Sequence, residues 1–130
     1  MKKNTLLLIA FFATQFLFAQ APIGVAKGIP ISYESVENRP MFPGGINEFI
    51  RFVGKNFRAP EVEGLSGDLK VSFIIETSGL IEEVKIINDL GHGTADEIKR
   101  VLAKCPKWTP GDQGGKPVRV LYSLPIAIRN

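Results

Sequence analysis

The segment Cys105–Ile128 restricts the possible folds of this chain more than any other segment does. Pro106 ends a helical pattern, a Pro/Gly loop follows over residues 107–111, and an apolar strand pattern occupies residues 118–128. In that strand, one set of alternate positions is apolar or aromatic throughout and the other set is mixed. Pro125 cannot donate to a strand ladder, and strand prolines therefore lie at sheet edges or bulges. The segment predicts an edge strand, which is a geometry for recognition rather than for catalysis.

The first residues of the chain have the pattern of a secretory signal. Lys2 and Lys3 form a basic start, residues 5–19 form an apolar run, and Ala19 precedes a polar residue. We expect cleavage after Ala19, so that residues 1–19 are a signal peptide and the protein is exported. A membrane span needs roughly 20 apolar residues, which is more than this run provides. The alternative is that the run stays uncleaved and anchors the chain in a membrane.

Removal of the signal changes the charge of the chain. The full sequence has 16 Lys and Arg against 13 Asp and Glu, and loss of Lys2 and Lys3 leaves 14 against 13, a balance of +1. Nucleic-acid binding needs a clustered basic face, which this balance does not indicate. About 110 of the 130 residues remain, enough for one domain with one core. A single cysteine cannot form an internal disulfide, so packing must hold the domain together.

A helix and a hairpin are predicted after a lead-in over residues 20–40. The helix covers residues 46–56, because apolar residues recur there in steps of three and four. Strands over residues 67–76 and 80–89 form the hairpin. The apolar residues of its second strand change parity, which predicts a bulge at Glu82–Glu83.

A second helix is predicted from Thr94 to Cys105. Thr94 and Glu97 have the spacing of a capping box, which is worth about 1 kcal/mol. The predicted fold class is α+β, a two-layer domain in which two helices cover one face of a three-stranded antiparallel sheet. The domain covers residues 41–130, and the lead-in before it holds at most a short extended piece over residues 29–36.

Cys105 and His92 are the pair of side chains that suggests nucleophilic catalysis, but their positions argue against it. Cys105 lies on the apolar stripe at the C-terminal end of the second helix, where the helix dipole disfavours a thiolate. His92 precedes the opposite end of that helix, about 18 Å away at 1.5 Å per residue. We therefore interpret Cys105 as a core residue and predict no catalytic residues. An enzyme that depends on Cys105 is the least favoured alternative.

The sequence contains no pattern typical of a metal or cofactor site. One histidine and one cysteine do not provide zinc-ligand spacing. A phosphate-binding loop ending at Gly115-Lys116 would need glycine at position 110 and Ser or Thr at position 117, and both are proline. The acidic residues are dispersed, as on a solvated surface. We predict neither a cofactor nor a bound metal.

The predicted edge strand has two interpretations that the sequence leaves open. Its unpaired N–H and C=O groups can bind an extended peptide as an added strand. Alternatively, Pro125, Arg119 and Arg129 simply protect the edge from aggregation. Trp108 also has two interpretations, since it can close the core where the helix meets the loop or stack on a ligand.

Several short motifs, taken in order, resemble the C-terminal domain of TonB in the form common in Bacteroidetes-type proteins. They are Pro43-Gly44-Gly45, Pro60, Gly67, Ser78-Gly79, Cys105-Pro106-Lys107-Trp108-Thr109-Pro110-Gly111 and Gly115-Lys116-Pro117-Val118. The resemblance covers residues 39–128. Each motif is short, and their order and spacing carry the resemblance.

The resemblance implies a periplasmic, non-catalytic module of TonB-dependent transport. Such a domain binds the TonB box, a short segment of outer-membrane receptors, as a strand beside its own last strand. The implied peptide-binding edge is Arg119, Leu121, Tyr122, Ser123, Pro125 and Ala127. The implied supporting loop is Lys107, Trp108, Pro110, Gly111 and Lys116. The family usually has an aromatic residue before the proline at position 60, whereas this chain has Ala59, which weakens a contact there.

The resemblance also defines the alternatives. A transducer resembling TonB carries a membrane anchor and a long Pro-rich linker, whereas residues 20–40 reach about 70 Å at most. We expect a free periplasmic module that binds a receptor or another extended peptide, with no nucleic acid or small-molecule cofactor as partner. The alternative is a short energy transducer anchored in the inner membrane through residues 5–19. The open sheet edge also permits a homodimer.

Overall fold

The computed structural model describes residues 27–130, and the predicted signal peptide lies outside the described residues. The elements in chain order are β1 (Ile31–Ser32), α1 (Ile46–Asn56), β2 (Ser66–Ile75), β3 (Ile81–Asn88), α2 (Thr94–Ala103), β4 (Gly111–Gln113), β5 (Lys116–Val118) and β6 (Val120–Arg129). Among residues 27–130, none of the helices has the length and apolar character needed to cross a membrane.

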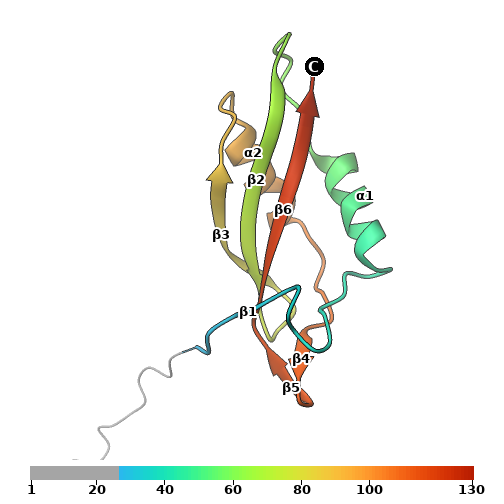
Figure 1. Ribbon diagram of the computed structural model, residues 1–130. Helices are drawn as coiled ribbons and strands as arrows, with labels where there is room; N and C mark the ends of the chain where they lie inside the picture. The colour runs from blue at the N-terminus through green and yellow to red at the C-terminus, as the bar shows by residue number, and fades with distance from the viewer. Residues whose placement is uncertain (1–26) are drawn as a thin grey trace, which may run out of the picture.

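Four strands form the main sheet in the order β1-β6-β2-β3 (Figure 1). β2 pairs antiparallel with β3 on one side and with β6 on the other. β1 pairs parallel with the start of β6, and β4 and β5 form a separate two-stranded hairpin. Two long strands, β2 and β6, therefore lie at the centre of the molecule, and α1 runs beside β6 in the view of Figure 1.

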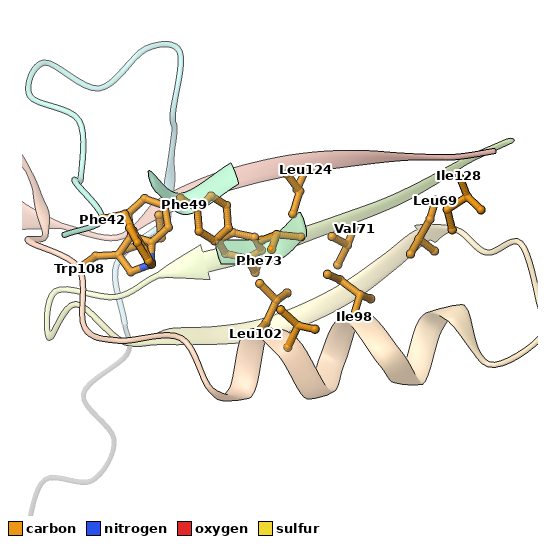
Figure 2. Packing of buried hydrophobic residues seen from close by; sticks show 13 residues of the cluster. Phe42, Phe49, Leu69, Val71, Phe73, Ile98, Leu102, Trp108, Leu124 and Ile128 are labelled. Carbon is orange, nitrogen blue, oxygen red and sulfur yellow. The ribbon is translucent and has the colours of Figure 1, made fainter. Parts of the chain in front are cut away.

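Both helices cover the same face of the sheet, as predicted. α1 contributes Phe49 and Val53 to the core, and α2 contributes Ile98, Val101 and Leu102. These side chains pack on alternate residues of the two central strands, which are Leu69, Val71, Phe73 and Ile75 of β2 and Leu124 and Ile128 of β6 (Figure 2). The α+β class and the two-layer arrangement are confirmed.

The prediction of a three-stranded antiparallel sheet is wrong. β1 adds a fourth strand, and it runs parallel to β6 with Ile31 opposite Val120 and Ser32 opposite Leu121. Two residues are too few to show a period-two pattern, so this strand has no sequence signal beyond the extended piece expected in residues 29–36.

The predicted last strand over residues 118–128 is also divided differently. Val118 ends β5, which pairs with β4, and β6 begins at Val120. Arg119 lies between the two strands, where the chain leaves the small hairpin and enters the main sheet. The period-two pattern continues through this break, which is why the sequence suggested one strand.

The first helix is found at the predicted residues, and the second begins at the predicted Thr94 but differs in its cap and in its C-terminal end. α2 has Gly93 as its N-cap residue, and Thr94 is its first helical residue. The Thr94 hydroxyl donates to the Gly91 carbonyl at 2.7 Å rather than capping the helix. The predicted capping box is therefore wrong. α2 ends at Ala103, two residues before the predicted Cys105.

Glu97, the other residue of the predicted box, joins the two helices instead. Its carboxylate accepts the backbone N–H of Arg58, just after α1, at 2.8 Å. It also accepts hydrogen bonds from the Arg100 guanidinium, which in turn donates to the Asn56 carbonyl at 2.7 Å. The hydrogen bonds from Arg100 lower the pKa of Glu97 to about 2.

The bulge predicted at Glu82–Glu83 is confirmed. Ser72 pairs with Lys85 and Ile74 with Glu82, so one residue of β2 faces two residues of β3. Glu83 has a φ of +52°, in the left-handed region that non-glycine residues rarely adopt. The bulge turns the Glu83 side chain toward Arg119, which accounts for part of the ion cluster described below.

Candidate binding edge

The outer side of β6 is open beyond its first two residues. Within residues 27–130, β2 pairs with one side of β6 along its whole length, whereas β1 pairs with the other side at the first two positions. The Leu121 carbonyl accepts the Tyr33 N–H at 2.9 Å, so the backbone groups of Leu121 point away from β2. This direction alternates along an antiparallel strand. Ser123, Pro125 and Ala127 therefore direct their backbone groups to the open side.

Pro125 fits this geometry without loss of a ladder hydrogen bond. It lies opposite Lys70 in the β2–β6 register, at a position whose backbone groups point outward. The N–H that proline lacks would face the open side, so the pairing with β2 is complete. The edge-strand prediction from Pro125 is confirmed for the part of β6 that lies beyond its pairing with β1.

A groove runs beside this open edge, between β6 and α1. Its first cavity has a volume of about 190 Å³. The lining residues are Ile50, Val53, Gly54, Leu124, Pro125, Ile126 and Ala127. Among the described residues, only uncharged side chains line this cavity. It can therefore accept an apolar side chain, whereas a charged group would lose its hydration there.

A second cavity of about 260 Å³ continues the groove toward the C-terminus. It is lined by Val53, Gly54, Phe57, Ala59 and residues 126–130. We call the two cavities together the α1–β6 groove. Ala59 lines this second cavity. The small side chain leaves the cavity open rather than filling it.

Ile50 is the apolar residue of α1 that the fold leaves uncovered. Phe49 and Val53 are buried on the sheet, whereas Ile50 exposes 48% of its surface and lines the first cavity. Its apolar surface is available to whatever occupies the groove.

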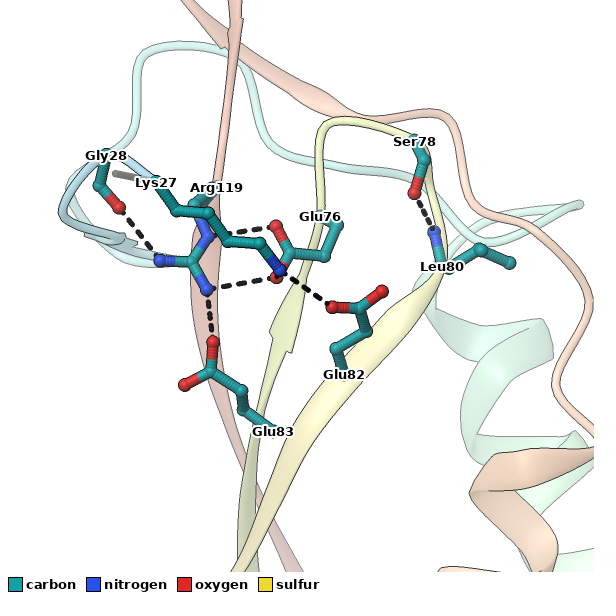
Figure 3. Close-up of polar contacts among 8 residues, drawn as sticks. All are labelled: Lys27, Gly28, Glu76, Ser78, Leu80, Glu82, Glu83 and Arg119. Carbon is teal, nitrogen blue, oxygen red and sulfur yellow. Dashed lines mark hydrogen bonds and ion pairs between the residues drawn. The ribbon is translucent and has the colours of Figure 1, made fainter. Parts of the chain in front are cut away.

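Arg119 does not extend toward the open edge, because its side chain lies in an ion cluster at the start of β6 (Figure 3). Its guanidinium donates two hydrogen bonds to the Glu76 carboxylate, each of 2.9 Å, and one to Glu83. A further hydrogen bond of 2.8 Å reaches the Gly28 carbonyl. Lys27 adds an ion pair with Glu82 at 3.1 Å. We call these charged residues the Arg119 cluster.

The Arg119 cluster fixes the lead-in on the sheet. Glu76 is buried, and the hydrogen bonds from Arg119 lower its pKa, so that it remains ionised. The bond from Arg119 to Gly28 holds the chain just before β1 against the start of β6. The cluster therefore keeps β1 paired over the first residues of β6.

Tyr122 and Leu121 lie where β1 meets β6. The Tyr122 ring stacks on Phe73, with ring centroids 5.4 Å apart, and meets the Tyr33 ring edge-on at 4.8 Å. Burial raises the pKa of Tyr122. Arg39 lies over the Tyr33 ring at 4.7 Å and donates to the Tyr33 carbonyl at 2.9 Å. Both predicted edge residues thus border the β1 contact, whereas Ser123, Pro125 and Ala127 lie beyond it.

Trp108 joins three distant parts of the chain. Its ring lies 4.8 Å from Phe49 and 5.6 Å from Phe42, measured between centroids, and it is buried. Its backbone N–H donates to the Gly79 carbonyl at 2.9 Å. The next residue, Thr109, exchanges two backbone hydrogen bonds with Met41, of 2.8 and 2.9 Å. We call this contact among Met41, Phe42, Gly79, Trp108 and Thr109 the Trp108 joint.

Two glycines allow the chain segments to approach one another at the joint. Gly79 has a φ of +88°, and a Cβ there would lie 2.1 Å from the Trp108 carbonyl oxygen. A Cβ at Gly111 would lie 2.9 Å from both Pro40 and Val120. Pro110 is half-buried beside Gly111, whereas Lys107 and Lys116 are exposed. The predicted supporting loop thus divides into a buried part and an exposed part.

Cys105 packs at the margin of the core. The Trp108 indole N–H donates to its sulfur at 3.3 Å. Burial raises the pKa of the Cys105 thiol, which is the opposite of what a nucleophile requires. Within residues 27–130, no three His, Cys, Asp or Glu side chains are grouped so that they could hold a metal ion.

Comparison with known protein families identifies the chain. Residues 61–127, just over half of the sequence, match the family described as Gram-negative bacterial TonB protein C-terminal. The chain belongs to this family. The resemblance of its motifs to the TonB C-terminal domain is confirmed. Domains of this family are periplasmic binding and transducer modules linked to TonB-dependent transport.

A solved structure is also similar to this TonB C-terminal domain. It is the solution NMR structure of the Pseudomonas aeruginosa TonB C-terminal domain, with 18% sequence identity. The likeness covers 76% of this chain and 92% of that chain, with a TM-score of 0.45. The comparison with curated proteins gave no match.

The α1–β6 groove is the feature that sequence reasoning missed. The apolar stripe of the first helix predicts that its residues all face the core, whereas Ile50 remains exposed at its margin. Gly54, which lines both cavities, lies inside the predicted helix over residues 46–56. A glycine inside a helical pattern is a weak but usable signal, because it lowers helix stability without an evident local need.

Proposed function

We propose that this TonB C-terminal domain binds an extended peptide, the TonB box of an outer-membrane receptor, by strand addition along β6. The observation that supports the proposal is the open backbone of Ser123, Pro125 and Ala127 beside the apolar α1–β6 groove. Main-chain hydrogen bonds would provide affinity, and the groove would select alternate side chains of the peptide.

The start of β6 limits where the peptide can lie. β1 already pairs with Val120 and Leu121, and the Arg119 cluster holds β1 there. The added strand then covers Ser123 to Arg129, seven residues or about 23 Å at 3.3 Å per residue. In this arrangement Leu121 and Tyr122 border the bound peptide. Arg119 does not contact the peptide but holds β1 on the start of β6. The loop that leads the chain into β6 supports this strand in its place. Its residues are Lys107, Trp108, Pro110, Gly111 and Lys116.

Binding is tested by titrating the isotope-labelled chain with receptor N-terminal peptides and following backbone amide signals. We expect the largest shifts from Ser123 to Arg129. A version of the peptide with proline at its centre lacks a central N–H and should bind at least tenfold more weakly. If no peptide shifts these amides, strand addition at β6 is wrong.

Ser123 offers a matched pair of variants for the same test. Ser123→Pro removes an outward N–H at a position with the same backbone direction as Pro125, so the sheet should remain intact. We expect about tenfold weaker peptide binding from the loss of one hydrogen bond. Ser123→Ala keeps the N–H and should bind like the wild type. Equal affinity of the two variants would contradict the model.

The place of the protein in the envelope depends on residues 1–26, which lie outside the described residues. We propose a periplasmic module released by cleavage after Ala19. The apolar run over residues 5–19 supports a second candidate, a short energy transducer anchored in the inner membrane. Sequencing the N-terminus of the mature protein from a Gram-negative host separates them. A mature chain that begins at Gln20 would exclude the anchored form.

A further inference from the structure

Gly54 lies where the two cavities of the α1–β6 groove meet, and it lines both of them. It belongs to the last turn of α1, and the Phe57 N–H donates to the Val53 carbonyl at 2.8 Å across this turn. The helix therefore continues through Gly54 without interruption.

The fold gives no reason for a glycine at this position. Gly54 is not among the residues with positive φ, so its backbone is one that any residue can adopt. Apart from its chain neighbours and the backbone of its own helix, a Cβ built on it meets no described atom within 4 Å, in contrast to Gly79, where a Cβ would overlap the Trp108 carbonyl. Glycine also makes a helix less stable than alanine does. For the folding of α1 alone, alanine would be the better residue.

The space that a Gly54 side chain would enter is part of the groove. A strand added along β6 points alternate side chains toward the helix layer, and successive ones lie about 6.6 Å apart. The groove offers two adjacent cavities between β6 and α1, and Gly54 lines both of them, as do Val53, Ile126 and Ala127. Their linings are mostly apolar, so the fitting occupants are uncharged, apolar side chains.

We infer that Gly54 determines which peptides this domain accepts. Without a side chain, it leaves room for larger apolar residues at two alternate positions of an extended peptide bound to β6. This inference rests on the proposed function and adds to it a residue that sets the size limit. A side chain at position 54 would narrow both cavities while leaving the open backbone of β6 unchanged.

The test compares Gly54→Ala and Gly54→Leu with the wild-type chain. The probe is a receptor N-terminal peptide in two versions, with leucine or with alanine at two alternate positions. We expect the wild type to bind the leucine version roughly tenfold more tightly, because more apolar surface is buried. Gly54→Ala should reduce this preference to threefold or less, and Gly54→Leu should abolish it.

Thermal unfolding provides a second measurement, in which Gly54→Ala should improve stability although it weakens binding. Gly54→Ala should raise the Tm by roughly 4–8 °C while it weakens binding of the leucine version. A glycine with a structural role would instead give a lower Tm. Lys55→Leu is the matched control, because it places leucine on the neighbouring residue, which does not line the groove cavities. It should keep the wild-type preference.

The outcomes separate this inference from the function on which it rests. If the wild type binds at β6 and the Gly54 variants keep its preference for leucine, Gly54 does not set specificity, although strand addition stands. If the wild type binds neither version and the β6 amides do not shift, the proposed function fails as well. Loss of the preference in the Gly54 variants, but not in Lys55→Leu, supports the assignment.

Discussion

The Trp108 joint and the α1–β6 groove both depend on glycine, but for opposite reasons. At the joint, Gly79 is in contact with the Trp108 backbone, and a Cβ would lie 2.1 Å from the carbonyl oxygen. In the groove, a Cβ at Gly54 would meet no described atom within 4 Å outside its chain neighbours and its own helix backbone. One glycine allows the chain to close on itself, and the other leaves a space open.

The difference separates residues that hold the domain from residues that would select its partner. Motifs that identify the family, such as Ser78-Gly79 and Trp108 to Gly111, meet at the joint and are used in packing. Ile50, Gly54 and Ala59 help to line the groove, and none of them belongs to these motifs. Changes at the joint should therefore alter stability, and changes in the groove should alter binding.

The largest effect is expected for Trp108→Ala. The indole packs on Phe42 and Phe49, so its removal leaves a large cavity. We expect a loss of about 3–5 kcal/mol in the free energy of unfolding, measured by denaturant titration. A loss below about 1 kcal/mol would show that the joint does not hold the core.

Gly79→Ala should have the next largest effect. The new methyl group would displace the Trp108 carbonyl, and alanine is disfavoured at a φ of +88°. We expect a loss of about 2–4 kcal/mol in denaturant titration. The control is Gly114→Ala, which has a φ of +59° but open space around its Cβ, and should cost about 1 kcal/mol. Equal losses would mean that the close approach to Trp108 is unimportant.

The Arg119 cluster should make stability depend on pH. Hydrogen bonds from Arg119 lower the pKa of folded Glu76 below its unfolded value. Its stabilising effect is therefore complete above the unfolded pKa and is lost as pH falls through the folded pKa. Glu76→Gln should lower the free energy of unfolding by about 1–3 kcal/mol at pH 7.

That difference between wild type and Glu76→Gln should shrink in acid, where the wild-type carboxylate is itself protonated. Unfolding measured from pH 7 down to pH 3 tests this. A difference that stays constant over the whole range would argue against the ion pair as its cause.

A smaller change in stability, but a clear change in binding, is expected for Ile50→Ser. Ile50 is half exposed on α1, so the free energy of unfolding should change by about 0.5 kcal/mol or less. Affinity for a receptor N-terminal peptide should fall roughly tenfold, since apolar surface in the groove is lost. Calorimetric titration measures the affinity. If the free energy of unfolding falls and the peptide affinity does not, Ile50 contributes to core packing rather than to peptide binding.

Pro125→Ala should have the smallest effect on stability. It provides an N–H on the open side of β6 without changing the pairing with β2. The free energy of unfolding should therefore change by about 0.5 kcal/mol or less. The added donor should raise peptide affinity a few-fold or promote a dimer through the edge. Sedimentation over a range of concentrations detects the dimer. No change in either property would mean that this position does not meet a partner strand.

Much of the fold could be predicted because its elements carry strong local patterns. The apolar stripe from Ile46 to Phe57 predicted α1, and the change of parity in the apolar residues at Glu82–Glu83 predicted the bulge. Pro125 correctly marked an edge, because its missing N–H excludes a fully paired strand. These features depend on residues close in sequence, which is why a sequence pattern reveals them.

The rest depends on contacts between distant residues. β1 forms because the lead-in meets the start of β6 and the Arg119 cluster holds it there. Glu97 bonds to Arg58 after α1 rather than to its own helix terminus. In each case a long-range partner replaced the local one, and no spacing within the sequence specifies that partner.

The sequence by itself determined the α+β class, the edge character of the last strand and the family, since these follow from periodicity, proline chemistry and ordered motifs. The tertiary structure decided how much of that edge is free and what lies beside it. β1 covers the start of β6, and α1 is set so that Ile50 and Gly54 border the remainder. The physical reason is that a groove exists only between elements, and its shape depends on how closely they pack.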